Sequence, residues 1–195
     1  MSGLTVKVAK KFTDIGMIIK YPNKTPVKNN KEEIKINDFS DDFLPTHMRV
    51  IIEDTAGMGK STITKKLFLS AIEKKAGIPI LIELRQINKN NSFLNEIQNQ
   101  LSPIGKPIAI DVILKLILEG EFIFLFDGFD EISKADKEFV IKDLHKFIEK
   151  ANNNYFLITS RQEDSLVSFG DFQKFNVITG SNVTLTLTTS DNVVF

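Results

Sequence analysis

Nine residues in the first third of the chain constrain its fold more than any others. Residues 54–62 read Asp-Thr-Ala-Gly-Met-Gly-Lys-Ser-Thr; the apolar run Val50-Ile51-Ile52 precedes them and an amphipathic helical pattern follows them. This order of strand, glycine loop and helix is typical of a phosphate-binding loop. Gly57 and Gly59 lack a Cβ, so the backbone can turn tightly there and bring its N–H groups against phosphate oxygens.

The residues of this loop have distinct expected roles. Lys60 supplies a positive charge for the β- and γ-phosphates, and the Ser61 hydroxyl is suited to hold a magnesium ion. The helix that begins here directs its positive end toward the anion. We therefore expect the phosphates to be held by Thr55, Ala56, Gly57, Met58, Gly59, Lys60, Ser61 and Thr62.

The loop departs from the full pattern Gly-x4-Gly-Lys-[Ser/Thr] at its first position, which is Asp54. The carboxylate either lies near the phosphate site or points outward. A positive φ at this position would strain Asp more than Gly, although Asp tolerates that conformation better than most residues. Asp54 leaves the expected fold unchanged and puts the nucleotide affinity in question. The alternative is an ordinary glycine-containing turn before a helix.

A second segment, residues 121–132, reads Glu-Phe-Ile-Phe-Leu-Phe-Asp-Gly-Phe-Asp-Glu-Ile. The five apolar residues 122–126 predict a strand buried on both faces of a parallel sheet. Asp127 closes that run at the carboxyl end, where open α/β sheets bind ligands, and there it can hold Mg²⁺ opposite the loop serine. Asp130 and Glu131 follow, and we expect one of them to orient or deprotonate an attacking water. The alternative is a core strand followed by an acidic turn.

A third apolar segment, residues 155–161, reads Tyr-Phe-Leu-Ile-Thr-Ser-Arg and ends in two hydroxyls and a guanidinium. A polar group at this strand end can sense a γ-phosphate, and Arg161 can offset charge in the transition state. The alternative is that Arg161 caps a neighbouring helix or pairs with an acid such as Glu163 or Asp164.

Taken together, the three segments resemble those of NACHT NTPases, which belong to the STAND class of signalling ATPases. Residues 54–62 resemble the Gly-x-Ala-Gly-x-Gly-Lys-[Ser/Thr] loop of the family. Residues 125–131 resemble its Walker B box, in which a small residue follows the magnesium-binding Asp and an Asp-Glu pair lies beyond it. Residues 158–161 are similar to its Thr-Ser-Arg sensor strand. The agreement extends over about residues 48–178, with departures at Asp54 and at Gln162, where the family often has Pro.

The resemblance implies a three-layer α/β P-loop NTPase fold around a central, mostly parallel five-stranded sheet. It also implies ATP or GTP and Mg²⁺ as cofactors, and a nucleotide-driven change from a closed resting state to an open, self-associating one. Proteins of this class work in innate immunity, programmed cell death and defence against phage. Helical, winged-helix and repeat domains usually follow the sensor strand, and an effector usually lies at one end. Because the sequence shows neither, we expect a fragment, a truncated product or a degenerate remnant.

Composition agrees with such a domain and argues against other classes. The chain has 25 basic and 25 acidic residues, which gives it no general attraction for nucleic acid or anionic membranes. It has no Cys, which excludes disulfides and thiolate metal sites and fits a reducing cytoplasm. The start of the chain lacks the apolar core of a signal peptide, and no window approaches the roughly 18 apolar residues of a membrane helix. We therefore expect a cytoplasmic protein.

The periodicity of apolar residues predicts strands that alternate with helices, and hence a parallel sheet. We expect strands at about 49–53, 78–84, 122–126, 155–159 and 175–178. Helices are expected at about 60–75, 93–101 and 108–118, with a fourth after a cap at Ser133 and Asp136. Apolar stripes on the first and fourth helices predict that they bury Ile63, Leu67, Phe68, Ala71 and Ile72, and Val140, Leu144, Phe147, Ile148 and Ala151. Gly77 is expected to end the first helix.

These patterns divide the chain into three expected parts. Residues 1–47 form an N-terminal extension, with short strands possible at 6–8 and 17–19 and a solvated polar linker at 28–35. Residues 48–178 form the NTPase domain. Residues 179–195 form a tail rich in Thr, Ser and Asn, which is either a strand or disordered.

The functional prediction is a domain that binds ATP or GTP with Mg²⁺ and hydrolyses it slowly, as the switch module of a NACHT-type signalling or defence protein. Asp130, Glu131 and Arg161 are the expected catalytic residues. One alternative is a nucleotide-locked switch that barely turns over, which Asp54 favours. The other is a phosphotransferase on the same scaffold. Such enzymes usually carry a basic lid, whereas residues 162–195 hold one basic residue, Lys174.

Overall fold

The computed structural model of the chain describes residues 17–19, 34–36 and 43–177. The expected strand at 6–8 and the tail at 179–195 lie outside these residues. The strands are β1 Met17–Ile19, β2 Ile34–Ile36, β3 Arg49–Glu53, β4 Ile78–Glu83, β5 Phe122–Asp127, β6 Tyr155–Ser160 and β7 Gln173–Phe175. The helices are α2 Phe43–His47, α3 Lys60–Lys74, α4 Phe93–Leu101, α5 Ile110–Glu119 and α6 Lys137–Lys150, with the 3₁₀ turns η1 Leu84–Gln86, η2 Phe129–Glu131 and η3 Asp164–Ser168.

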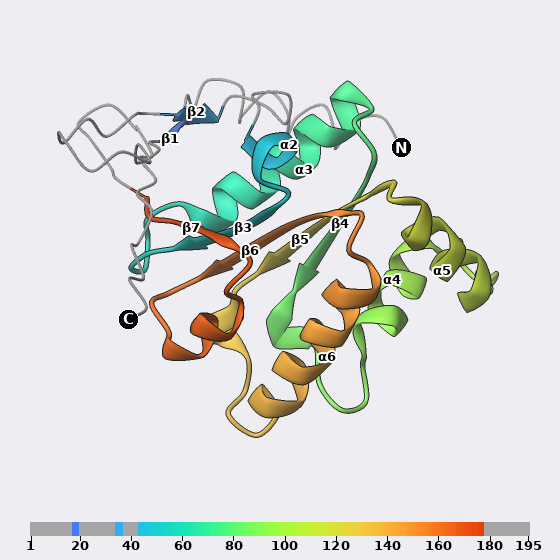
Figure 1. Ribbon diagram of the computed structural model, residues 1–195. Coiled ribbons are helices and arrows are strands. Elements are labelled where there is room, and N and C mark those ends of the chain that lie inside the picture. Colours follow the sequence, from blue (N-terminus) through green and yellow to red (C-terminus); the bar gives the residue numbers. More distant parts are fainter. Residues whose placement is uncertain (1–16, 20–33, 37–42, 178–195) are drawn as a thin grey trace, which may run out of the picture.

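A five-stranded sheet of order β4-β5-β6-β3-β7 forms the centre of the domain, and every neighbouring pair in it is parallel. Helices cover both of its faces (Figure 1). This confirms the predicted three-layer α/β P-loop NTPase fold. The two short strands β1 and β2 pair antiparallel outside this sheet, so part of the polar run at 28–35 is a strand rather than linker.

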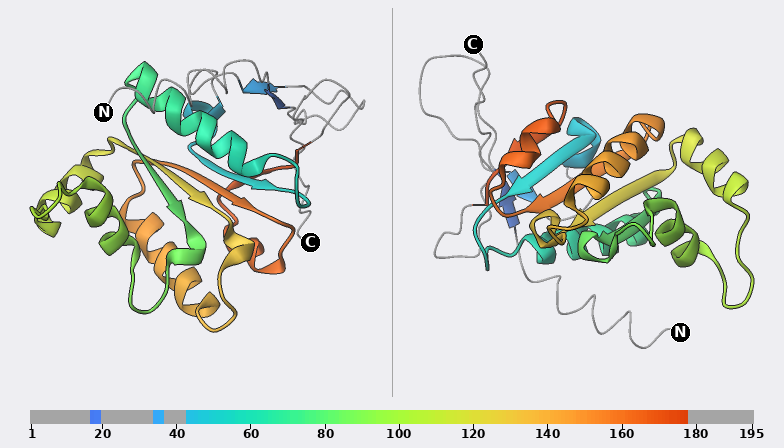
Figure 2. Two further views of the ribbon diagram at one scale, coloured as in Figure 1. Left: turned by 180° about the vertical axis from the view of Figure 1, so that it is seen from behind. Right: turned by 90° about the horizontal axis from the view of Figure 1, so that it is seen from below.

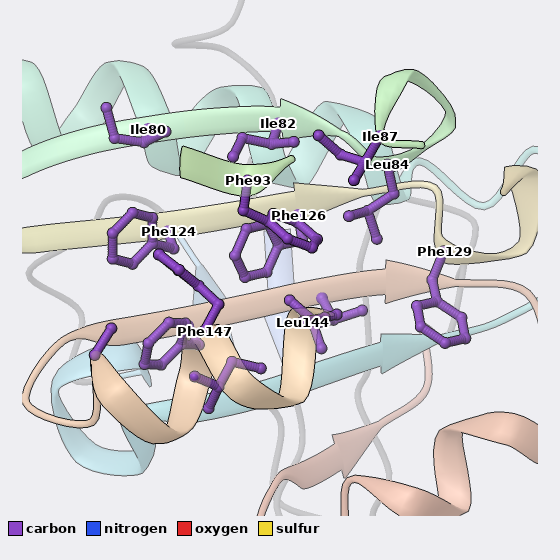
Figure 3. Close-up of a cluster of buried hydrophobic side chains, with 14 of the residues drawn as sticks. Ile80, Ile82, Leu84, Ile87, Phe93, Phe124, Phe126, Phe129, Leu144 and Phe147 are labelled. Carbon is purple, nitrogen blue, oxygen red and sulfur yellow. The ribbon is translucent and has the colours of Figure 1, made fainter. Parts of the chain in front are cut away.

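Different helices cover the two faces of the sheet. Successive side chains along each strand point to opposite faces, so each strand contributes to two separate clusters. Phe122, Phe124 and Phe126 of β5 belong to one core cluster, which α4, α5 and α6 cover, whereas Ile123 and Leu125 belong to a second cluster, which α2 and α3 cover. The views in Figure 2 show the same division of the helices. Figure 3 shows the aromatic cluster, where Phe147 of α6 packs edge-on against Phe124 with 4.9 Å between ring centroids.

The order of the strands creates a crevice at one end of the sheet. β3 and β6 are neighbours, but β3 leads into α3 on one face, whereas β6 leads into η3 on the other. Two connections that leave adjacent strands in opposite directions open a gap beyond their carboxyl ends, where open α/β sheets bind ligands. The phosphate-binding loop predicted at 54–62 lies at this point.

The end of α3 differs from the prediction. Lys75, with φ 53°, adopts the left-handed conformation that ends the helix, two residues before Gly77. Gly77 is required for a different reason, since a Cβ there would lie 2.8 Å from the carbonyl oxygen of Glu121. Ile72 is 48 % exposed, so its assignment to the buried face was wrong. The smaller Ser70 is buried on that face instead.

Two other boundaries also shift. The fourth helix begins at Lys137, because Ser133 and Asp136 bond to each other in the turn that precedes it rather than in its first turn. β7 ends at Phe175, short of the predicted 178. Beyond it, the N–H of Val177 donates to the Asp54 carboxylate at 2.8 Å. The predicted buried stripe of the fourth helix is confirmed in full.

Candidate functional site

An open cavity of about 330 Å³ lies where the carboxyl ends of β3, β5 and β6 meet. Of the predicted site residues, all except Thr55 line it. The lining residues are Ala56, Gly57, Met58, Gly59, Lys60, Ser61, Thr62, Asp127, Gly128, Asp130, Glu131, Thr159 and Arg161. Segments that are up to about a hundred residues apart in sequence therefore meet at one concave surface.

The glycines of the loop give it a conformation that other residues rarely adopt. Gly57 and Gly59 have φ values of 81° and 83°, and a Cβ at either position would meet no atom within 4 Å. Glycine is therefore required at both positions because of the backbone angles, since a side chain there would not clash with other atoms. Gly59 is also the N-cap of the 15-residue helix α3. The N–H groups of the first helical turn have no partner within a helix, and they carry its positive end to the cavity.

Lys60 lies within the curve of its own loop. Its Nζ donates to the carbonyl oxygens of Asp54 and Thr55 at 2.7 and 2.6 Å. Burial lowers the pKa of the Lys60 ammonium, while the carboxylates of Asp54 and Asp130 act in the opposite direction. The loop thus holds a partly desolvated ammonium group at the cavity, where its interaction with an anion is stronger than in bulk water.

Asp54 does not line this cavity. One carboxylate oxygen accepts the N–H of Thr55 at 2.6 Å, and the other accepts the N–H of Val177 at 2.8 Å. Among the described residues, the only ones other than glycine with positive φ are Met48 and Lys75, so the loop does not strain Asp54. The Asp54 carboxylate therefore accepts backbone N–H groups at the two ends of this contact. The sequence left two orientations open, and in the structure the side chain lies outside the cavity.

Asp127 at the end of β5 is joined to the strand beside it. The Thr159 hydroxyl on β6 donates to Asp127 Oδ1 and accepts the N–H of Gly128 at 3.1 Å. Gly128 has φ 77°, and a Cβ there would lie 3.1 Å from the Glu131 carboxyl carbon. The residue after the acid must therefore be small, both for its own backbone and for the approach of Glu131.

The two acids beyond Asp127 have different surroundings. Both carboxylate oxygens of Asp130 bind Arg161, one through its backbone N–H at 2.9 Å and the other through Nε at 3.1 Å. Arg161 thus pairs with this acid rather than with Glu163 or Asp164. The Glu131 side chain is 51 % exposed, against 19 % for Asp130, and its carboxylate lies 3.8 Å from Nη1 of Arg85.

The donors at the cavity fit Mg²⁺ that arrives with a nucleotide. Ser61 and Asp127 both line it and offer a hydroxyl and a carboxylate, the hard oxygen ligands that this ion prefers. Within the described part of the chain, no group of three or more acidic, His or Cys side chains could hold a metal by itself. Mg²⁺ usually keeps several waters and binds through one or two carboxylates and the phosphates of a substrate, which agrees with this sparse donor set.

Sequence reasoning missed two residues that support the site, Arg85 and Lys137. Arg85 follows β4 and donates to Glu83 through Nη2 at 2.6 Å, and this contact raises the pKa of the guanidinium. Glu83 on β4 lies opposite Asp127 on β5, so Glu83 and Arg85 add two charged side chains beside Asp127 at this edge of the sheet. The sequence did offer a signal for Arg85, because this residue directly follows a predicted strand. Lys137 donates through Nζ to the carbonyl oxygen of Phe129 and to Glu163, and no pattern in the sequence indicated either contact.

The family model for the NACHT domain matches residues 48–176. Among curated proteins, none matches the chain significantly. One similar solved structure is that of C. elegans PCH-2, at 14 % identity and a TM-score of 0.39, covering 74 % of this chain and 36 % of that chain. The chain thus spans little more than a third of the length of that protein. Within the described residues, no helix combines the length and apolarity needed to cross a membrane.

Proposed function

The chain belongs to the NACHT domain family of P-loop NTPases, and we propose that it binds ATP or GTP with Mg²⁺ and hydrolyses the nucleotide slowly. The observation that carries the proposal is the convergence at one cavity of a left-handed glycine loop, a helix N-terminus, a lysine and three acids. The helix N-terminus and the lysine favour a polyanion, and the acids are suited to a metal and a water.

In this proposal the loop residues hold the phosphates. The amides of 55–62 and the Lys60 ammonium would bind them, and Lys60 would give up its two bonds to loop carbonyls in exchange. Ser61 and Asp127 would hold Mg²⁺, which when bound neutralises phosphate charge. Thr159 would fix the orientation of Asp127 through its hydrogen bond.

We assign the general base to Glu131. Its carboxylate is half exposed at the cavity, whereas both oxygens of Asp130 bind Arg161. Asp130 would therefore orient Arg161, and Arg161 would bind the γ-phosphate and offset its charge. From the sequence, either acid could act on the attacking water. In this proposal Glu131 does so, and Asp130 orients Arg161.

The wider role that we propose is that of the nucleotide switch in a NACHT-type signalling or defence protein in the cytoplasm. Self-association through the NTPase domain would follow nucleotide exchange. This role rests on family membership, and the cavity supports the nucleotide-dependent part of it.

Release of inorganic phosphate tests the proposal. The parent protein should release phosphate from ATP or GTP only with Mg²⁺, and both Lys60→Ala and Glu131→Gln should abolish release. Glu131→Gln should still bind nucleotide, because the residue acts on the water rather than on the phosphates. Tight binding without release by the parent would instead identify a nucleotide-locked switch. Release that survives in Lys60→Ala would contradict the assignment of the site.

A further inference from the structure

Behind the cavity, Lys137 joins two of the segments that form it. Its Nζ donates to the carbonyl oxygen of Phe129 at 2.6 Å and to Glu163 Oε2 at 2.8 Å. Phe129 begins η2, which carries Asp130 and Glu131, whereas Glu163 follows β6 two residues after Arg161. One ammonium group therefore links the acidic turn to the arginine loop.

The surroundings of Lys137 favour a fixed geometry. Its side chain is 19 % exposed and that of Glu163 is 29 % exposed. Nζ also lies 4.0 Å from the centroid of the buried Phe129 ring, in a cation–π contact. Figure 3 shows this ring beyond the carboxyl end of β5, apart from the main aromatic cluster. Three contacts thus hold the ammonium group, and two of them are to the first residue of η2.

The link continues from Glu163 to the phosphate-loop strand. The N–H of Glu163 donates to Oε1 of Glu53, the last residue of β3, at 2.9 Å. Oε1 of Glu163, the carboxylate oxygen that Lys137 does not bind, accepts the Ser165 hydroxyl at 2.9 Å. A chain of polar contacts therefore runs from β3 through the arginine loop to η2, and none of Glu53, Glu163 and Lys137 lines the cavity.

We propose that Lys137 is a positioning residue that, through Glu163 and the Phe129 carbonyl, holds Glu131 where it can take a proton from the water that attacks the nucleotide. This inference rests on the proposed function and extends it to a residue that touches neither nucleotide nor water. On the cavity side Asp130 and Arg161 join the two segments, and the reaction would use both of these residues. The link behind the cavity keeps the segments together when those contacts change. Because small displacements of reacting groups lower rates steeply, loss of this link should affect turnover more than binding.

Lys137→Met tests the proposal, because it keeps the alkyl chain and removes the three N–H donors. We expect kcat to fall about tenfold or more, whereas Kd for the nucleotide changes less than about twofold. Lys137→Arg should recover part of kcat, because a guanidinium can still donate to both partners. The matched control is Lys134→Met, an exposed lysine three residues earlier, which should leave both constants unchanged.

Amide hydrogen exchange in the nucleotide-free protein tests the same link without the reaction. The N–H groups of Glu131 and Ile132 donate within η2, and we expect them to exchange at least about tenfold faster in Lys137→Met than in Lys134→Met. Should Lys137→Met not fold, Glu163→Gln serves in its place, since it keeps the shape and removes the charge. Unchanged kcat with unchanged exchange would overturn the proposal, as would a loss of affinity equal to the loss of kcat. If the parent binds no nucleotide, the proposed function fails, but exchange at η2 still decides whether Lys137 holds that turn.

Discussion

Asp54 binds Val177: a carboxylate oxygen at the start of the phosphate-binding loop accepts a backbone N–H just beyond the last strand, at 2.8 Å. The same carboxylate accepts the N–H of Thr55 through its other oxygen. The residue that departs from the loop pattern therefore joins the loop to the edge strand of the sheet, and its charge is directed at backbone donors rather than at the cavity.

This contact predicts a stabilising role for Asp54. Asp54→Ala should lower the free energy of unfolding by about 1–2 kcal/mol, since the part-buried N–H of Val177 and the exposed N–H of Thr55 lose a charged acceptor. Asp54→Asn keeps one acceptor oxygen and should lose less. Urea denaturation of the three proteins measures both differences. Nucleotide affinity should change little in either variant, and an alanine variant as stable as the parent would refute this role.

The loop glycines predict a second effect. Gly59→Ala should destabilise the fold by about 1–2 kcal/mol, because φ is 83° there and L-residues avoid that region. It should also weaken nucleotide binding, because the N-cap of α3 must shift. Gly170→Ala is the matched control, since its φ lies outside that region and a Cβ would meet no atom within 4 Å. Equal thermal stability of the two variants would mean that the loop does not need its left-handed backbone.

Thr159 provides a third prediction. Thr159→Val keeps the shape of the side chain but removes the hydroxyl that bonds Asp127 and the Gly128 N–H. We expect a loss of about 1–3 kcal/mol in stability and a higher Mg²⁺ concentration at half-maximal phosphate release. Thr159→Ser should restore most of both. A valine variant with unchanged Mg²⁺ dependence would show that Asp127 needs no partner on β6.

The protonation of His145 predicts how stability depends on pH. Burial lowers its pKa below the ordinary value of 6.5, and its ring stacks on Phe169 with 4.1 Å between centroids. The unfolded chain therefore takes up a proton before the folded chain as the pH falls. Stability should decline as the pH falls below about 6.5, and decline less in His145→Gln. Denaturation midpoints measured at several pH values check this. The dependence should not disappear, because burial lowers the pKa of His47 in the same way.

Much of this architecture could be predicted because local signals agreed with one another. The five apolar residues from Phe122 to Phe126 are typical of a strand that is buried on both faces, and the acid that follows them marks its carboxyl end. Gly57 and Gly59 predicted a special backbone, and both have positive φ. Where the period of the pattern, the loop and the strand end all indicated one fold, the elements lie within a few residues of their predicted places.

The remaining features depend on contacts between distant segments, which periodicity does not report. β7 ends before the predicted residue, and just beyond it Asp54, 123 positions away, accepts the N–H of Val177. Arg161 pairs with Asp130 in η2, the turn that follows another strand, rather than with the acids close to it in sequence. Lys137 looks like any exposed helix lysine until the fold brings Glu163 to it.

Calorimetric titration of nucleotide into the purified chain measures whether the loop binds a purine triphosphate. With Mg²⁺ present, ATP or GTP should give saturable heat at one site. We expect a Kd in the micromolar range, which corresponds to a binding free energy of about −8 kcal/mol. Lys60→Ala should remove that heat, whereas Lys65→Ala, an exposed lysine on the same helix, should keep it. Absence of heat for every purine triphosphate with the parent protein, or equal heat from Lys60→Ala, would show that this loop is not a nucleotide site.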